Sequence, residues 1–248
     1  MITLLRNQLG SVRNVYLRGN HIDRRDDFAQ FPEVVLLLHG FFQTRNIWEV
    51  MEHRLRRHNY GVFSLDLGGL LWRFNTRSIE YQSRWLADKI ERIVEKHRIG
   101  KIHIIGHSMG GLLAKQYIQQ HGGERRVKSL ITLGTPHHGT PTALLGVFLM
   151  GGGLLSRSPL QMLPRSKVIQ SLRTEAFPSA ISLTSIFSKG DVICPWWCSV
   201  LRKSPQQLYI RNVAIRGIGH SELTSDNKVF QIVLQHLSES SEQEPAEY

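Results

Sequence analysis

The sequence predicts an α/β fold in which helices cover both faces of a mostly parallel sheet. Short, continuous apolar runs alternate with segments of helical character along the chain. Strands and helices that alternate in this way form parallel sheets through right-handed crossovers. The 248 residues, 41% hydrophobic and 21% charged, suit one globular domain with a substantial core.

Each main element of this fold is placed by a local pattern. Strands are expected at residues 12–17, 33–39, 61–66, 101–105, 127–133, 181–187 and 208–215. Helices are expected at 46–58, 79–97, 109–120 and 225–237, with the clearest apolar stripe at 79–97.

The regular alternation breaks between residues 140 and 179, where glycine, proline and serine mix with apolar residues. This segment is expected to be a cap or lid inserted between two strands. Residues 1–237 are therefore expected to form a single domain. The polar, acidic tail at 238–248 is expected to be disordered.

The chain is strongly basic, with a formal net charge of +11. Lysine and arginine are scattered between the predicted elements without a nucleic-acid-binding motif, so no nucleic-acid partner is expected. The charge is either an ordinary solvated surface or a means of peripheral contact with an anionic membrane.

Other features bear on location and cofactors. The start M1-I-T-L-L-R-N-Q-L-G does not have the pattern of a secretory signal, so a cytoplasmic protein is expected. The apolar run from Ala143 to Leu155 is too short and too rich in glycine to span a bilayer as a helix. Cys194 and Cys198 are expected to be reduced thiols, and no metal or cofactor is expected.

The motif G106-H-S-M-G places Ser108 between a predicted strand and a predicted helix. Glycines two residues to either side permit a turn so tight that it lifts the serine side chain clear of the backbone, as in a nucleophile elbow. The alternative is that Ser108 only caps the helix. Ser221 in G219-H-S-E-L lacks the second glycine and the preceding strand, so it does not match the pattern.

A serine hydroxyl needs a base to remove its proton and a carboxylate to orient that base. In sheets with a nucleophile elbow, the acid and then the histidine follow the serine, each on a loop after a later strand. Asp191 and His220 occupy such positions. Asp66 precedes the serine and is expected to form a turn, whereas Asp226 is expected at the start of the last helix.

Two backbone amides are candidates for an oxyanion hole. One is the amide of Met109, directly after Ser108, and the other belongs to Phe41 in H39-G-F-F. Phe42 takes this role if the turn is shifted by one residue.

The candidate substrate-binding residues are Phe42, His107, Leu144, Phe148 and Trp196. The run that contains Leu144 and Phe148 is either an exposed patch for lipid or acyl chains, or a buried cap helix. Trp196 either forms a wall of the acyl pocket or packs the cap interface. His137 and His138 follow a strand that comes too early for the base, so they are expected to shape a loop or line a pocket.

The motifs G106-H-S-M-G-G-L, H39-G-F-F, L133-G-T-P-H-H-G-T, G190-D-V-I-C-P and G219-H-S-E-L occur in this order. Together they resemble the α/β-hydrolase fold of bacterial triacylglycerol lipases and esterases over residues 32–237. This resemblance implies Ser108, Asp191 and His220 as the catalytic triad. It also implies Phe41 and Met109 as oxyanion donors and a lid after Thr140. Some relatives bind calcium, but no acidic cluster suited to it is found.

The resulting hypothesis is a serine carboxylester hydrolase, a lipase or esterase that acts on acyl esters or lipids through an acyl-enzyme intermediate. Two alternatives stay open. The same nucleophile would serve an acyltransferase or a thioesterase, and a chain that has kept only the fold would be a non-catalytic membrane-surface binding protein. The oligomeric state is not predicted.

Overall fold

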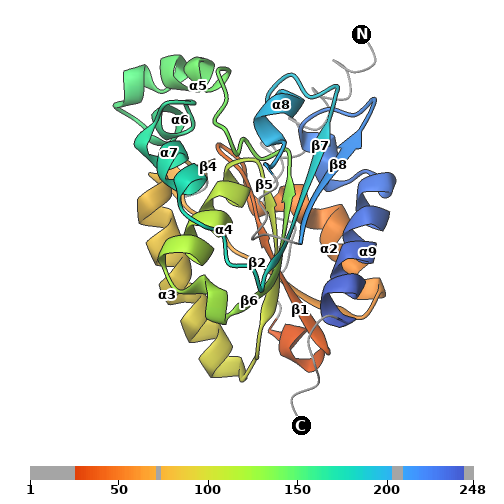
Figure 1. Ribbon diagram of the computed structural model, residues 1–248. Coiled ribbons are helices and arrows are strands. Elements are labelled where there is room, and N and C mark those ends of the chain that lie inside the picture. Colours follow the sequence, from red (N-terminus) through yellow and green to blue (C-terminus); the bar gives the residue numbers. More distant parts are fainter. Residues whose placement is uncertain (1–25, 71–73, 203–208, 243–248) are drawn as a thin grey trace.

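The computed structural model describes residues 26–70, 74–202 and 209–242. Its centre is a six-stranded sheet in the order β2-β1-β5-β6-β7-β8, and every adjacent pair of strands is parallel (Figure 1). The strands are β1 (Glu33–Leu38), β2 (Tyr60–Ser64), β5 (Ile102–His107), β6 (Val127–Leu133), β7 (Ser182–Ser188) and β8 (Ile210–Ile215). The predicted fold class, a mostly parallel sheet flanked by helices, is confirmed.

Helices cover both faces of this sheet, as Figure 1 shows. One face carries α3 (Ile79–His97) and α4 (Met109–Gln120), and the other carries α2 (Glu49–Arg57) and α9 (Asn227–Glu242). The central strands therefore bury side chains in two directions. Along β1, Val34, Leu36 and Leu38 join the core under α3 and α4. Val35 and Leu37 join the core under α2 and α9, which explains why this run is apolar without alternation.

Between β6 and β7 the chain forms short helices at the edge of the sheet where the strands end (Figure 1). They are α5 (Ala143–Leu149), α6 (Ser158–Gln161) and α7 (Lys167–Thr174), with a 3₁₀ turn at Gly151–Gly153. These helices fall within the predicted insertion at 140–179. Whether the insertion moves as a lid stays a prediction.

Most predicted elements lie within a few residues of the observed ones, and the helices 79–97 and 109–120 have the predicted bounds. The segment predicted as a helix at 46–58 begins as a 3₁₀ turn, Arg45–Trp48, before α2. A short hairpin of β3 (Gly69–Leu70) and β4 (Phe74–Asn75) and the small helix α8 (Trp196–Ser199) were not predicted. The strand predicted at 12–17 lies outside the described residues.

The predicted disorder after residue 237 is wrong for residues 238–242, because α9 continues through Glu242. The reason is a buried polar contact that composition does not reveal. Ser240 is buried, its hydroxyl lies 2.9 Å from that of Ser182 at the start of β7, and it also donates to the carbonyl of His236. These bonds hold the last helical turn against the sheet.

Cys194 and Cys198 are free thiols and both are buried. Within the described ranges, no helix is long and apolar enough to cross a membrane.

At the edge where the strands begin, one carboxylate joins three strands. Glu33 on β1 lies 3.2 Å from His103 Nε2 on β5 and accepts a 3.0 Å bond from Lys128 Nζ on β6. The bond to His103, supported by Lys128 and opposed by partial burial, lowers the pKa of Glu33 from 4.5 to about 2.

We therefore expect Glu33→Gln to lower the free energy of unfolding near pH 7 by less than about 1 kcal/mol, because the carboxylate is partly exposed. A depressed folded-state pKa stabilises the protein above the unfolded value of 4.5, and this contribution is lost between pH 4.5 and about 2. Urea unfolding across this range should show the two proteins converging at the acid end. A difference that stays constant with pH would contradict the role of the charge.

Candidate active site

Ser108 occupies a strained turn between β5 and α4. Its backbone has φ 53° and ψ −124°, outside the regions favoured by residues other than glycine. Although Ser108 stands at the N-cap position of α4, its side chain makes no capping hydrogen bond. The helix-cap alternative is therefore not supported, and the conformation is that of a nucleophile elbow.

The glycines of the motif are required by close backbone approach. A Cβ atom on Gly106 would lie 2.6 Å from the backbone of Gly111, and one on Gly110 would lie 2.2 Å from the carbonyl oxygen of Leu38. Gly40 is equally confined, because its Cβ would lie 2.8 Å from the Cβ of Ser108. These contacts bring the end of β1 directly against the turn that carries the serine.

Asp191 and His220 form a buried hydrogen-bonded pair. The Nδ1 of His220 lies 2.6 Å from Asp191 Oδ2, and the aspartate side chain has no exposed surface. The other carboxylate oxygen, Oδ1, accepts bonds from the backbone amides of Ile193 at 2.9 Å and Cys194 at 2.8 Å. With Nδ1 donating to the aspartate, Nε2 is left to exchange a proton with a nucleophile or leaving group.

Asp66 and Asp226, the two other aspartates considered as the partner of the histidine, make different contacts. Asp226 accepts bonds from the amides of Lys228 and Val229 and so caps the start of α9, as predicted. Asp66 lies 3.9 Å from the guanidinium of Arg45, after the end of β2. In the described part of the chain, Asp191 is the carboxylate that contacts the His220 ring.

The loop after β1 offers one free amide beside the serine. The amide of Phe42 is occupied, because it donates to the carbonyl of Asn75 at 3.0 Å. The amide of Phe41 makes no such bond within the described ranges, and Met109 begins α4, where backbone amides have no intrahelical partner. The geometry therefore favours Phe41 over Phe42 as the partner of Met109.

A buried polar network, not predicted from the sequence, organises this loop. Gln43 Oε1 accepts a 2.8 Å bond from the amide of Gly40 and lies 3.0 Å from His107 Nδ1. His107 Nε2 lies 3.0 Å from the carbonyl oxygen of His220. Burial, and then the neighbouring His220, hold the pKa of His107 well below its ordinary value, so its ring is neutral. These contacts bring together the loop after β1, the end of β5 and the loop that carries His220, and the neutral ring, with a single N–H, donates to one of the two oxygens.

Ser108 and His220 line the same cavity of about 380 Å³. Most of its other lining residues are apolar or small, and they come from the oxyanion loop, the insertion and the loop after Asp191. They are Phe41, Gln43, Pro136, Thr140, Thr142, Ala143, Leu145, Gly146, Leu149, Pro159, Met162, Val192, Ile193, Cys194 and Ser221. The cavity is thus an apolar chamber with a serine and a histidine in its wall.

The predicted substrate-binding residues do not line this cavity. His107 has no exposed surface because its ring is enclosed by Gln43 and His220. Phe42 and Trp196 also lie outside the lining, and Trp196 instead packs against Trp197 with ring centroids 5.9 Å apart.

On α5, Leu144, Leu145, Phe148 and Leu149 are all exposed, and of these Leu145 and Leu149 line the cavity. The run is thus an exposed apolar patch and not a buried helix, and the role of Leu144 and Phe148 in substrate binding stays a prediction.

No group of three or more His, Cys, Asp or Glu side chains is arranged to hold a metal ion in the described ranges.

Comparison with known proteins agrees with this architecture. A family model described as "alpha/beta hydrolase fold" matches residues 33–156, half of the chain, and the chain therefore belongs to the α/β-hydrolase family.

Among curated relatives, a pimeloyl-[acyl-carrier protein] methyl ester esterase of Aeromonas hydrophila is 33% identical over 106 residues. This match covers 43% of the chain and 39% of that protein. The probable lysophospholipase BODYGUARD 4 of Arabidopsis thaliana is 29% identical over 117 residues, which are 46% of the chain and 27% of that protein. The matches thus span less than half the length of these relatives.

Among solved structures, the mature lipase BlEst2 of Bacillus licheniformis superposes with a TM-score of 0.66 over 88% of the chain and 96% of that structure. The identity is 17%, so this likeness concerns the fold alone.

The close approach at Gly110 gives a direct test of the elbow. Gly110→Ala places a methyl group against the carbonyl oxygens of Leu38 and His39, so we expect it to lower the free energy of unfolding by about 1–3 kcal/mol. Gly100→Ala is the matched control, because a Cβ there meets no atom within 4 Å. The control should change stability by less than about 1 kcal/mol. Equal unfolding midpoints in urea for both variants would contradict the proposed packing.

Proposed function

We propose that this protein is a serine carboxylester hydrolase. The observation that carries the proposal is the buried Asp191–His220 hydrogen bond in the wall of a cavity that Ser108 also lines. A histidine oriented by a carboxylate, in the same cavity wall as a half-buried serine, is the arrangement needed to activate a hydroxyl for acyl transfer. Membership of the α/β-hydrolase family and the names of the relatives, an esterase and a probable lysophospholipase, support the same reaction class.

In the proposed mechanism, Ser108 Oγ attacks the ester carbonyl as His220 Nε2 takes its proton. The amides of Phe41 and Met109 stabilise the oxyanion, and each donor of this kind contributes about 2–3 orders of magnitude in rate. His220 then returns the proton to the departing alcohol, leaving an acyl-serine. A water molecule, deprotonated by the same histidine, attacks the acyl group and releases the acid. Asp191 holds the imidazole in the required tautomer and stabilises its cationic form.

Active-site labelling tests this mechanism directly. We expect a fluorophosphonate probe to label Ser108 and Ser108→Ala to abolish both labelling and hydrolysis of p-nitrophenyl esters. Asp191→Asn should lower turnover by about 10³–10⁴-fold without unfolding the protein, because the amide fixes the wrong histidine tautomer. Asp226→Asn changes a carboxylate outside the cavity and should retain turnover.

Absence of labelling in folded wild-type protein would favour a non-catalytic binding protein. Transfer of the acyl group to added alcohol or thiol in preference to water would instead favour an acyltransferase. Near-normal turnover by Asp191→Asn would move the acid role to another residue.

The substrate that this cavity suits best is an acyl ester of a lipid. Its walls are largely apolar, and α5 carries exposed apolar residues on the outside as well as towards the cavity. Phe148 is 82% exposed and Leu144 is 60% exposed. An exposed apolar patch at the mouth of an apolar cavity suits docking on a lipid surface, and the net charge of +11 favours anionic membranes.

Substitution of the outer face of α5 tests this substrate class. Phe148→Ser should reduce hydrolysis of long-chain esters presented on anionic vesicles several-fold, because it removes apolar contact with the surface. It should leave hydrolysis of a short, soluble p-nitrophenyl ester unchanged. Val50→Ser, an exposed apolar residue on α2, is the matched control. Activity confined to short soluble esters in the wild-type protein would identify an esterase without a lipid surface.

A further inference from the structure

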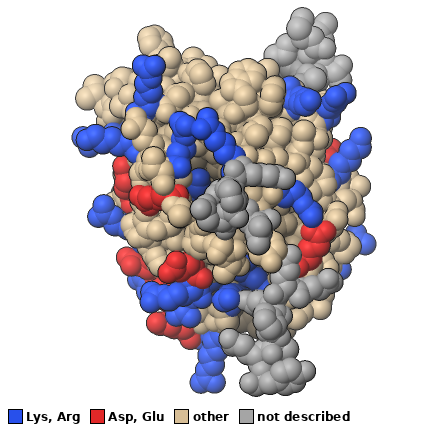
Figure 2. Space-filling model, in the orientation of Figure 1, with Lys and Arg blue, Asp and Glu red and all other residues tan. Residues whose placement is uncertain are grey.

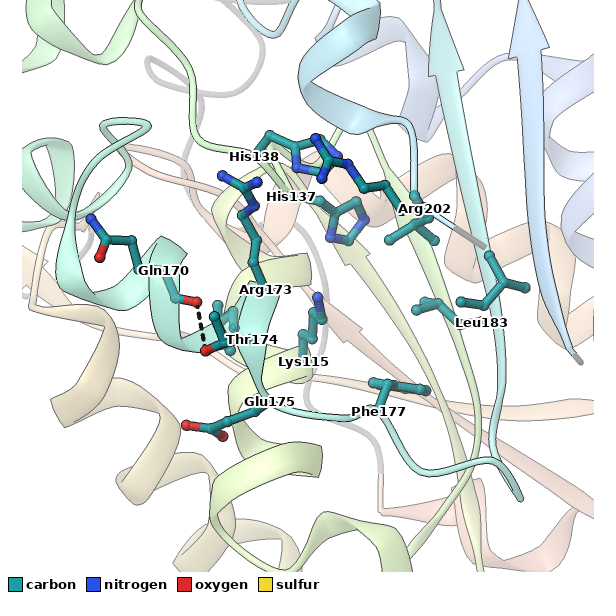
Figure 3. A pocket seen from close by; sticks show the side chains of 13 residues that line it. Lys115, His137, His138, Gln170, Arg173, Thr174, Glu175, Phe177, Leu183 and Arg202 are labelled. Atoms are coloured by element: carbon teal, nitrogen blue, oxygen red, sulfur yellow. Dashed lines mark hydrogen bonds between the residues drawn. The ribbon is translucent and has the colours of Figure 1, made fainter. Parts of the chain in front are cut away.

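A second cavity of about 470 Å³ lies between α4, α7 and the first residues of β7 and β8 (Figure 3). Its wall is unlike that of the catalytic cavity because basic side chains predominate among its polar groups. They are Lys115 from α4, Arg173 from α7, His137 and His138 from the loop after β6, and Arg202 after α8. In Figure 3 the Lys115 and Arg173 side chains extend towards the side of the cavity formed by the two histidines. Figure 2 shows blue side chains gathered around a hollow on this face.

The single carboxylate in the described wall of this cavity is engaged elsewhere. Glu175 Oε1 accepts bonds from Gln120 Nε2 and Ser171 Oγ, both at 2.7 Å. It makes no described ion pair with Lys115 or Arg173. Three cationic side chains, Lys115, Arg173 and Arg202, thus share the wall with one carboxylate, and cationic groups outnumber anionic ones.

Lys115 is the most buried of the Lys and Arg side chains in this wall. The residue is 8% exposed, and its ammonium group has no hydrogen bond or ion pair in the described part of the chain. Burial, and then the charge of Arg173, lower the pKa of Lys115 to about 8. Partial desolvation of this ammonium is therefore unfavourable, and an anion in the cavity would offset that cost.

His137 supplies a second buried polar group without a partner. It is 1% exposed, its Nε2 lies 3.0 Å from the hydroxyl of Thr132, and its Nδ1 is buried with no hydrogen bond. The Thr132 hydroxyl donates to the carbonyl of Thr184, so its oxygen accepts from Nε2, which carries the ring proton. Nδ1 is then an acceptor without a partner, and it is the cationic side chains of Lys115, Arg173 and Arg202 that favour an anion in this cavity.

Much of the remaining cavity wall is apolar. Leu172, Phe177, Leu183, Leu201 and Ile210 provide an apolar surface within the same cavity. A ligand that fills the space would satisfy both surfaces if it joined an anionic group to a short apolar part.

We propose that this cavity is a binding site for a small amphiphilic anion, with a phosphate or carboxylate group between Lys115 and Arg173. Arg202 and His138 border the same space, and the apolar part of the ligand lies against Phe177 and its neighbours. The site is separate from the catalytic cavity, since the two share no lining residue.

The two cavities are nevertheless adjacent along the chain. His137 and His138 line the anion site, whereas Pro136 and Thr140, on either side of them, line the catalytic cavity. Lys115 lies on the same helix that begins at Met109. A ligand in the second cavity thus contacts the outer side of two elements that form the catalytic wall.

Thermal unfolding at constant ionic strength tests the site without depending on ester hydrolysis. Inorganic phosphate, octyl phosphate and octanoate are added to the full chain at pH 7, with sodium chloride replaced to keep ionic strength fixed. We expect a concentration-dependent rise in Tm of a few degrees, larger for the octyl compounds than for inorganic phosphate. A larger effect of octyl phosphate than of octanoate would identify a phosphorylated ligand, and the reverse a carboxylate.

Substitutions then assign the effect to this cavity. Lys115→Met and Arg173→Gln should each weaken binding at least tenfold by calorimetry and remove most of the Tm shift. Lys115→Met should also raise Tm in the absence of ligand, because it removes a partly desolvated charge. Arg165→Gln, an exposed arginine just before α7 and outside the cavity, is the matched control and should bind like the wild type.

If Lys115→Met fails to fold, the exposed Arg173 and Arg202 provide variants that leave the core intact. The proposal is overturned if no anion shifts Tm at constant ionic strength. It is also overturned if Arg173→Gln and Arg202→Gln bind as tightly as the Arg165→Gln control.

Discussion

The arrangement of the cavity lined by Ser108 and His220 depends on one close contact, the approach of α4 and the end of β1 to the turn at Ser108. Gly110 touches the carbonyl oxygen of Leu38, and Gly40 faces the Cβ of Ser108, with no room for side chains at either position. Because Ser108 adopts a positive φ, its side chain leaves the line of the strand and reaches the cavity. The same contact brings the loop that holds Phe41 against the start of α4 at Met109.

Buried polar groups then hold the loops around this turn. Gln43 and His107 fill the space between the amide of Gly40 and the carbonyl of His220, so the loop after β1 and the loop that carries His220 are packed against one another. Burial keeps His107 neutral, which avoids a second positive charge 4.5 Å from the ring of His220. These polar groups thus position the loops around Ser108, and His220 alone carries out the proton transfers that we propose.

The two cavities lie on the same fold but have walls of different chemistry. The cavity lined by Ser108 and His220 has largely apolar walls, and the second cavity gathers the cationic side chains of Lys115, Arg173 and Arg202. Both are lined by the segment after β6, Pro136 and Thr140 in the first and His137 and His138 in the second.

The order of strands and helices, the elbow at Ser108 and the pairing of Asp191 with His220 were readable from the sequence. They follow from local patterns: apolar periodicity, glycine spacing and the order of polar residues after parallel strands. The face of α5 that lines the cavity, the bonding of His107, the helical end of α9 and the cluster around Lys115 were not readable. These depend on which side chains meet across elements far apart in the chain, and only tertiary packing decides that.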